Sequence, residues 1–172
     1  MKRMWSYILL VIVFVGCSKP NAEDMYKKGE DAQKADQFDA AISAYQELIK
    51  AYPDSTRTPE AVYAIGTIYQ NHKQSFHMAI QTYRQLIEKY PHHATSPSAS
   101  FLIGFMYNND LKNIDSARIA YEDFLNRYPN DQLAVSARFE LDHLGKDPAE
   151  ILKAQTQVAQ EETKPAKKGK NK

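Results

Sequence analysis

Residues 61–91 read AVYAIGTIYQNHKQSFHMAIQTYRQLIEKYP, and this stretch decides the fold because the chain repeats its pattern. The small and aromatic positions of its first half return 38 residues later as Ala99, Phe101, Ile103, Gly104 and Tyr107. Those of its second half return as Ala117, Tyr121, Phe124, Tyr128 and Pro129, and they also stand upstream as Ala41, Tyr45, Leu48, Tyr52 and Pro53. A fixed period of this length indicates a repeat array, in which each unit buries its apolar face only against its neighbours.

The helical spacing of the apolar residues predicts three pairs of helices. We expect them at residues 22–34 and 38–51, 59–71 and 76–90, and 97–109 and 114–128. Thr58 and Ser96 each precede a proline, a pattern typical of a capping hydroxyl at the start of a helix. Ser75 and Asn113 are expected to cap the second helix of their pairs.

Small residues mark the places where the two helices of a pair are expected to cross closely. These residues are Gly66 and Ala79 in one repeat and Gly104 and Ala117 in the next. Residues 133–144 begin a further repeat but carry Asp142 where the glycine stood, which suits a capping helix with a polar outer face. The expected fold is an all-α, right-handed α-solenoid of about three helix pairs over residues 22–145.

The N-terminus reads MKRMWSYILLVIVFVGC and ends at the only cysteine of the chain, Cys17. Its apolar run from Trp5 to Val15 is shorter than the roughly 20 residues that a membrane-spanning helix needs, but it suits a signal peptide. Gly16-Cys17 resembles a bacterial lipobox, although Phe14 stands where lipoboxes usually carry leucine. We expect residues 1–16 to be a lipoprotein signal peptide and 17–21 a tether lipidated on Cys17. The alternative is an ordinary secretory signal.

The repeats also carry a family resemblance. The spacing of Ile65-Gly66, Tyr69, Ala79, Tyr83 and Pro91 resembles the tetratricopeptide repeat, a helix–turn–helix unit, with 38 residues instead of the usual 34. Two envelope groups are most similar: the repeat lipoprotein of the outer-membrane β-barrel assembly machinery and the Tol–Pal-associated periplasmic repeat protein. The first group usually has about five repeats, and the second usually has a coiled coil and no lipid.

In tetratricopeptide stacks the first helix of each pair lines the concave face, where partners bind. By resemblance, the positions that face this groove are Tyr63, Thr67, Gln70, Phe101, Phe105 and Asn108. The alternative for Tyr63 and Phe101 is a purely structural place in the core. Phe105 is the better candidate, because Thr67 replaces it one repeat earlier and the scaffold therefore does not require an aromatic ring there.

The sequence offers no catalytic motif: we find no G-x-S-x-G, no phosphate-binding loop and no H-E-x-x-H. His92-His93 is not expected to bind a metal, and no cofactor is expected beyond the lipid. Residues 17–162 hold 21 acidic and 15 basic residues, which does not suit a nucleic-acid partner. We therefore expect a binding protein and no enzyme.

The C-terminal residues fall into two parts. Residues 146–162 predict a weak helix, and residues 163–172, TKPAKKGKNK, predict a disordered tail. The five lysines of the tail either keep the chain soluble or contact anionic envelope material.

The combined features predict a scaffold on the periplasmic side of the outer membrane. Ser18, which follows the cysteine, favours the outer membrane over the inner membrane. Its partners would be envelope proteins or peptide segments held in the groove, and assembly of outer-membrane β-barrels is the preferred role. The alternatives are a Tol–Pal or cell-wall-synthesis coordinator and an accessory binding subunit of an envelope enzyme or transporter.

Overall fold

The computed structural model describes residues 19–147, 149–150, 152–153 and 156. The expected signal peptide, Cys17 and the lysine-rich tail lie outside the described residues. The described part contains helices and turns and no strand. Its helices are α1 (Ala22–Lys34), α2 (Phe38–Ala51), α3 (Arg57–Asn71), α4 (Phe76–Lys89), α5 (Ser96–Asn109), α6 (Ile114–Arg127) and α7 (Ala134–His143).

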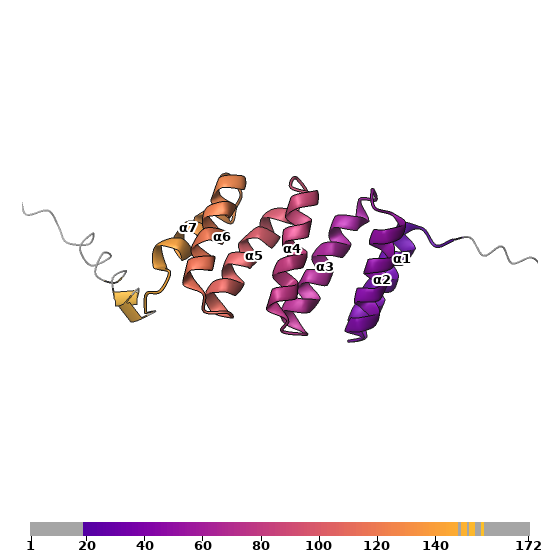
Figure 1. Ribbon diagram of the computed structural model, residues 1–172, viewed down its shortest axis with the longest axis horizontal. Coiled ribbons are helices and arrows are strands. Elements are labelled where there is room, and N and C mark those ends of the chain that lie inside the picture. The colour runs from indigo at the N-terminus through magenta and orange to yellow at the C-terminus, as the bar shows by residue number, and fades with distance from the viewer. Residues whose placement is uncertain (1–18, 148, 151, 154–155, 157–172) are drawn as a thin grey trace, which may run out of the picture.

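The helices follow one another in a single elongated row, from α1 and α2 at one end to α7 at the other (Figure 1). Each helix packs mainly against its neighbours in the chain, and the contacts within the pairs α1–α2, α3–α4 and α5–α6 are the most extensive. This arrangement is an α-solenoid of three helix pairs and a seventh helix, as the 38-residue period predicts. Residues 149–150, 152–153 and 156 are helical, and they fall within the expected C-terminal helix.

A tyrosine ring from the second helix lies against a glycine of the first helix in every pair. A Cβ atom added at Gly66 would lie 2.4 Å from Cε1 of Tyr83, so only glycine fits under this ring. Tyr121 covers Gly104 in the same way, and Tyr45 covers Gly29. Gly29 falls outside the 38-residue pattern, because it precedes Gly66 by 37 residues.

The prediction that Thr58 and Ser96 cap helices was wrong. The helices begin at Arg57 and Ser96, and both hydroxyls are buried. The Thr58 hydroxyl donates to the carbonyl oxygen of Tyr52, and the Ser96 hydroxyl donates to that of Tyr90 over 2.6 Å. Each hydroxyl therefore binds a carbonyl oxygen at the C-terminal end of the preceding helix. Such a carbonyl has no N–H partner within its own helix.

The two predicted caps of second helices had different outcomes. The side chain of Asn113 accepts a hydrogen bond from the backbone N–H of Ser116 over 2.9 Å, as expected. Ser75 makes no capping bond, and its hydroxyl points to the carbonyl oxygen of Lys73.

A second tyrosine ties the end of each helix pair to the segment before that pair, and in the second and third repeats it links successive repeats. Each tyrosine that ends a second helix donates its hydroxyl to the carbonyl oxygen of a proline in the preceding segment. The three bonds are Tyr52 to Pro20 (2.8 Å), Tyr90 to Pro53 (3.1 Å) and Tyr128 to Pro91 (3.1 Å). The Tyr-Pro pair therefore ends one helix pair and also binds it to the next.

The helix α7 differs from the expected polar cap. Ala134 and Ala137 are buried against the core, but Val135 and Phe139 are exposed. The ring of Phe139 stacks on His143 at a centroid distance of 4.1 Å. In α5 the equivalent ring, Phe101, packs on Tyr121 and Phe124 of the following helix. No helix of the described part is long and apolar enough to cross a membrane.

Candidate functional site

The six predicted groove residues lie on two first helices. Tyr63, Thr67 and Gln70 belong to α3, and Phe101, Phe105 and Asn108 repeat the same spacing on α5. Spacings of four and three residues bring each set onto one helix face. Five of the six side chains are partly exposed, and Phe105 is more exposed, with 37% of its surface accessible.

An open cavity of about 470 Å³ lies at the N-terminal end of this face. Tyr63 and Thr67 line it together with residues of α1 and α2 that the sequence analysis did not include, among them Tyr26, Glu30, Gln33 and Tyr45. These residues were missed because the first helix of the first repeat does not keep the 38-residue register. Tyr26, Glu30 and Gln33 precede Tyr63, Thr67 and Gln70 by 37 residues.

In the first two repeats, hydrogen bonds tie the groove face to the core tyrosines. The hydroxyl of Tyr83 donates to Oε1 of Gln70 over 3.1 Å and lies 3.3 Å from the hydroxyl of Thr67. Tyr45 makes the equivalent bond to Oε1 of Gln33 over 3.3 Å. Thr67 and Gln70 thus also serve the scaffold. Burial raises the pKa of Tyr83 to about 12, and the hydrogen bond from Thr67 lowers it in part.

The third repeat lacks this hydrogen bond. The hydroxyl of Tyr121 is buried and has no hydrogen-bond partner within the described part of the chain. Phe105 occupies the place of the threonine, and Asn108 has a shorter side chain than the glutamine it replaces. The amide of Asn108 instead points to Glu140 of α7, with 3.5 Å between Nδ2 and Oε2. Burial raises the pKa of Tyr121, and the charge of Glu140 raises it further.

Tyr63 and Phe101 have the packing role that the sequence analysis gave as an alternative, and their part in binding stays a prediction. Each is half-buried and packs against a core cluster. The ring of Tyr63 lies 5.6 Å from that of Tyr83, and the ring of Phe101 lies 5.6 Å from that of Tyr121. Their accessible edges remain on the face that carries Thr67 and Phe105. A substitution at either position is therefore expected to affect stability.

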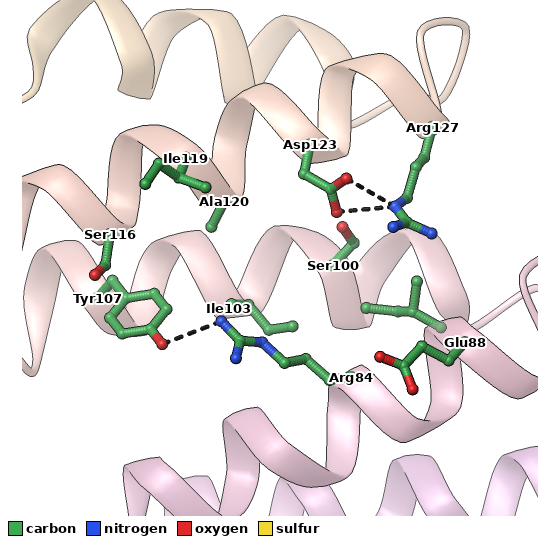
Figure 2. A pocket seen from close by; sticks show the side chains of 11 residues that line it. Arg84, Glu88, Ser100, Ile103, Tyr107, Ser116, Ile119, Ala120, Asp123 and Arg127 are labelled. Atoms are coloured by element: carbon green, nitrogen blue, oxygen red, sulfur yellow. Dashed lines mark hydrogen bonds and ion pairs between the residues drawn. The ribbon is translucent and has the colours of Figure 1, made fainter.

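A second pocket, which the sequence analysis missed, lies between α4, α5 and α6 (Figure 2). Its volume is about 330 Å³. Arg127 binds both carboxylate oxygens of Asp123, and Nη2 of Arg84 lies 3.3 Å from the hydroxyl of Tyr107. Ile119, with 68% of its surface exposed, lies at the rim. The equivalent pocket one repeat earlier carries Gln46, Gln85 and Lys89 at the positions of Arg84, Asp123 and Arg127.

The described residues contain no group of three histidine, cysteine, aspartate or glutamate side chains that could hold a metal ion. His72 stacks on Phe38 at 4.0 Å, and His93 lies 2.8 Å from the hydroxyl of Thr95. Both rings therefore have local structural contacts.

Comparison with known families agrees with this geometry. The model of the YfiO family, described as outer membrane lipoproteins, matches residues 18–162. The chain belongs to this family. The match covers the whole solenoid and the expected C-terminal helix of this YfiO-family lipoprotein. No curated protein matches its sequence.

Solved structures confirm the fold of the YfiO-family chain. It is similar to MamA from Desulfovibrio magneticus RS-1, residues 41 to the end, with a TM-score of 0.52 and 17% identity over 83% of this chain and 72% of that one. It is also similar to a double mutant of MamA from RS-1, with a TM-score of 0.55 and 17% identity over 86% and 80% of the two chains. At this identity the similarity concerns the fold alone.

Proposed function

We propose that this YfiO-family protein is a lipid-anchored scaffold that holds envelope proteins during the assembly of outer-membrane β-barrels. It has no catalytic role in this proposal. The family supports an outer membrane lipoprotein, and Cys17, directly before the matched residues, supports the site of the anchor. Acyl chains on Cys17 would tether the protein to the periplasmic side of the outer membrane, since several chains hold a protein firmly.

The observation that carries the scaffold role is the face formed by α3 and α5. Its aromatic rings and amide groups are repeated at one spacing along the stack, and Phe105 is exposed although it is large and apolar. A repeated face of this kind suits an extended peptide or a helix of a partner protein. Exposed aromatic rings contribute much of the binding energy at such interfaces.

The role in envelope assembly is tested by purifying the tagged protein from cross-linked membranes, with Cys17→Ala as the control. We expect the wild type to recover β-barrel assembly components and the variant to lose both these components and the membrane. Recovery of Tol–Pal or cell-wall-synthesis proteins instead would contradict the proposed pathway. Equal membrane association of the two forms would contradict the anchor.

The groove is tested by Phe105→Ala. We expect this variant to recover at least about fivefold less of the cross-linked partner, because an aromatic contact at an interface contributes more than about 1 kcal/mol. Its thermal stability should change little, since the ring is exposed. Ile119→Ala is the matched control, because Ile119 is an exposed apolar residue of the Figure 2 pocket on α6. Equal recovery from wild type and Phe105→Ala would exclude the groove.

A further inference from the structure

The third repeat of the groove carries a polar arrangement that the scaffold does not use. In the first two repeats the core tyrosine hydroxyl is bound by a glutamine, but the Tyr121 hydroxyl is buried and has no partner among the described residues. A buried polar group without a partner destabilises the fold. Such a group in a folded protein calls for an explanation, and a binding site is one.

Three oxygen-bearing side chains are linked at this place, because Asn108 contacts Glu140 and the charge of Glu140 acts on Tyr121. Tyr121 covers Gly104 as Tyr83 covers Gly66, and the hydroxyl of Tyr83 reaches Gln70. Because Asn108 stands at the position of Gln70, the hydroxyl of Tyr121 is directed toward the side of α5 that carries Asn108. Asn108 donates to Glu140 through Nδ2, which leaves its Oδ1 free to accept a hydrogen bond. Glu140 takes part in no ion pair within the described part of the chain, and its charge acts on Tyr121.

We propose that Tyr121, Asn108 and Glu140, beside the exposed ring of Phe105, form a subsite for a lysine side chain of the partner segment bound in the groove. This proposal rests on the proposed function and specifies one residue of its ligand. A lysine ammonium has three donors and matches three acceptor oxygens: the Tyr121 hydroxyl, Oδ1 of Asn108 and a carboxylate oxygen of Glu140. The ring of Phe105 would contact the aliphatic stem of the lysine.

Entry of the ligand requires one small movement. The Tyr121 hydroxyl is covered in the free protein, and the bond between Asn108 and Glu140 is long, at 3.5 Å. Both side chains are only half-buried. A cation that approaches Glu140 replaces the Asn108 amide as its partner, Asn108 turns, and the hydroxyl of Tyr121 becomes accessible.

The preference for a cation follows from charge. Glu140 is a half-buried carboxylate of α7, and it is not neutralised by any arginine or lysine in the described ion pairs. An acidic partner segment would be repelled here, and a neutral one would leave the Tyr121 hydroxyl unpaired and the charge of Glu140 without a counter-charge. A partner with lysine at this position satisfies both groups at once.

The test uses two synthetic peptides, acetyl-Ala-Ala-Lys-Ala-Ala-amide and the same peptide with norleucine in place of lysine. Binding to the chain from residue 18 onward is followed through the side-chain amide signals of Asn108 in nuclear magnetic resonance spectra. We expect the lysine peptide to shift these signals and to bind at least about tenfold tighter than the norleucine peptide. Equal binding of the two peptides, or no binding of either, would overturn the proposal.

Substitutions identify the groups involved. Glu140→Gln should weaken binding of the lysine peptide by about tenfold, and Tyr121→Phe should weaken it while leaving the melting temperature unchanged or higher. Glu88→Gln is the matched control, since Glu88 is an exposed carboxylate in the pocket of Figure 2. Equal losses in Glu140→Gln and Glu88→Gln would overturn the subsite, because they would show attraction to the overall charge alone.

The source of the lysine is decided by deleting residues 163–172, which contain five lysines. Unchanged affinity for the lysine peptide supports a site that is free for a partner. A tenfold gain would show that the chain's own lysines occupy the site and would overturn the assignment to a partner. If the lysine peptide does not bind while cross-linking still recovers barrel-assembly components, the subsite fails and the proposed function stands.

Discussion

Tyr45, Tyr83 and Tyr121 occupy one position of the repeat, but their hydroxyl groups differ in what they bind. All three rings are fully or almost fully buried over a glycine. Tyr45 and Tyr83 donate to the glutamines of their own repeats, and Tyr121 has no partner among the described residues. The ring is thus required by the packing, whereas the hydroxyl contributes to stability only where an amide meets it.

This difference predicts opposite results for two matched substitutions. Tyr83→Phe should lower the free energy of unfolding by about 1 kcal/mol, because it removes a hydrogen bond and leaves Oε1 of Gln70 unpaired. Tyr121→Phe should leave it unchanged or raise it, because it removes a buried hydroxyl that has no partner. Urea denaturation of the two variants measures both values, and equal losses would contradict the assigned hydrogen bonds.

The same tyrosines predict a loss of stability in alkali. Burial raises the pKa of Tyr83 from 10.0 to about 12, so the folded state binds its proton more tightly than the unfolded state. The resulting stabilisation is complete below pH 10 and is lost as the pH rises through 12. Tyr83→Phe should therefore reduce the slope of unfolding free energy against pH between 10 and 12. An unchanged slope would contradict the raised pKa.

The sequence predicted which residues of α3 and α5 share a face but not their hydrogen bonds. Residues 63, 67 and 70 and their equivalents on α5 share one face, because helical spacing determines which residues lie together. The unpaired hydroxyl of Tyr121 could not be predicted, because it depends on the shorter reach of Asn108 and on Glu140 of the next helix. The pocket of Figure 2 was missed because its lining comes from three helices and follows no motif.

At the scale of the helix, the pairs depend on small residues on both sides of the crossing. Ala79 of α4 and Ala117 of α6 are completely buried, and a larger side chain there would push the two helices apart. Their neighbours on the same helices include exposed apolar residues, such as Met78 and Ile119, which line the outer pockets. Substitutions at the buried alanines test the packing within the helix pair, and substitutions at the exposed apolar residues serve as their controls.

Ala79→Leu should lower the free energy of unfolding by about 1–3 kcal/mol, because three added carbon atoms have no space in a fully packed core. Met78→Leu on the same helix is the control, since 45% of the surface of Met78 is exposed and the volume hardly changes. Thermal or urea unfolding of both variants gives the comparison. A melt of Ala79→Leu within a degree of the wild type would contradict the tight crossing.

The helices themselves could be predicted closely from the sequence. The bounds of α1 and α2 agree with the expected residues, and α4 and α6 end one residue before the expected tyrosine. The starts of α3 and α5 differed, because a threonine or serine before proline was interpreted as a cap. Such a hydroxyl can accept a hydrogen bond from the N–H groups of the helix that follows, or donate one to a carbonyl oxygen of the helix before it. In the structure both hydroxyls donate to the carbonyl oxygen of the preceding tyrosine, which the sequence did not indicate.

At the scale of the whole molecule, the stack is held together by interfaces between neighbouring repeats. Apart from limited contact between α1 and α3, each helix packs chiefly on the helices next to it in sequence, so stability is approximately a sum over repeats and their interfaces. The hydrogen bonds from Tyr90 to Pro53 and from Tyr128 to Pro91 belong to these interfaces. Weakening one interface should therefore loosen one part of the molecule without loosening all of it.

Tyr90→Phe tests this independence, because it removes the hydroxyl that donates to Pro53 between the first and second repeats. We expect a loss of about 1 kcal/mol at this interface, which corresponds to roughly fivefold faster opening of the first repeat. Amide hydrogen exchange should accelerate by that factor in α2 and remain unchanged in α6. Tyr128→Phe is the matched variant, because its bond to Pro91 lies one repeat later, and it should accelerate exchange in α6. Equal acceleration in every helix by either variant would show that the solenoid opens as one unit, and the hydrogen bonds would then have no local role.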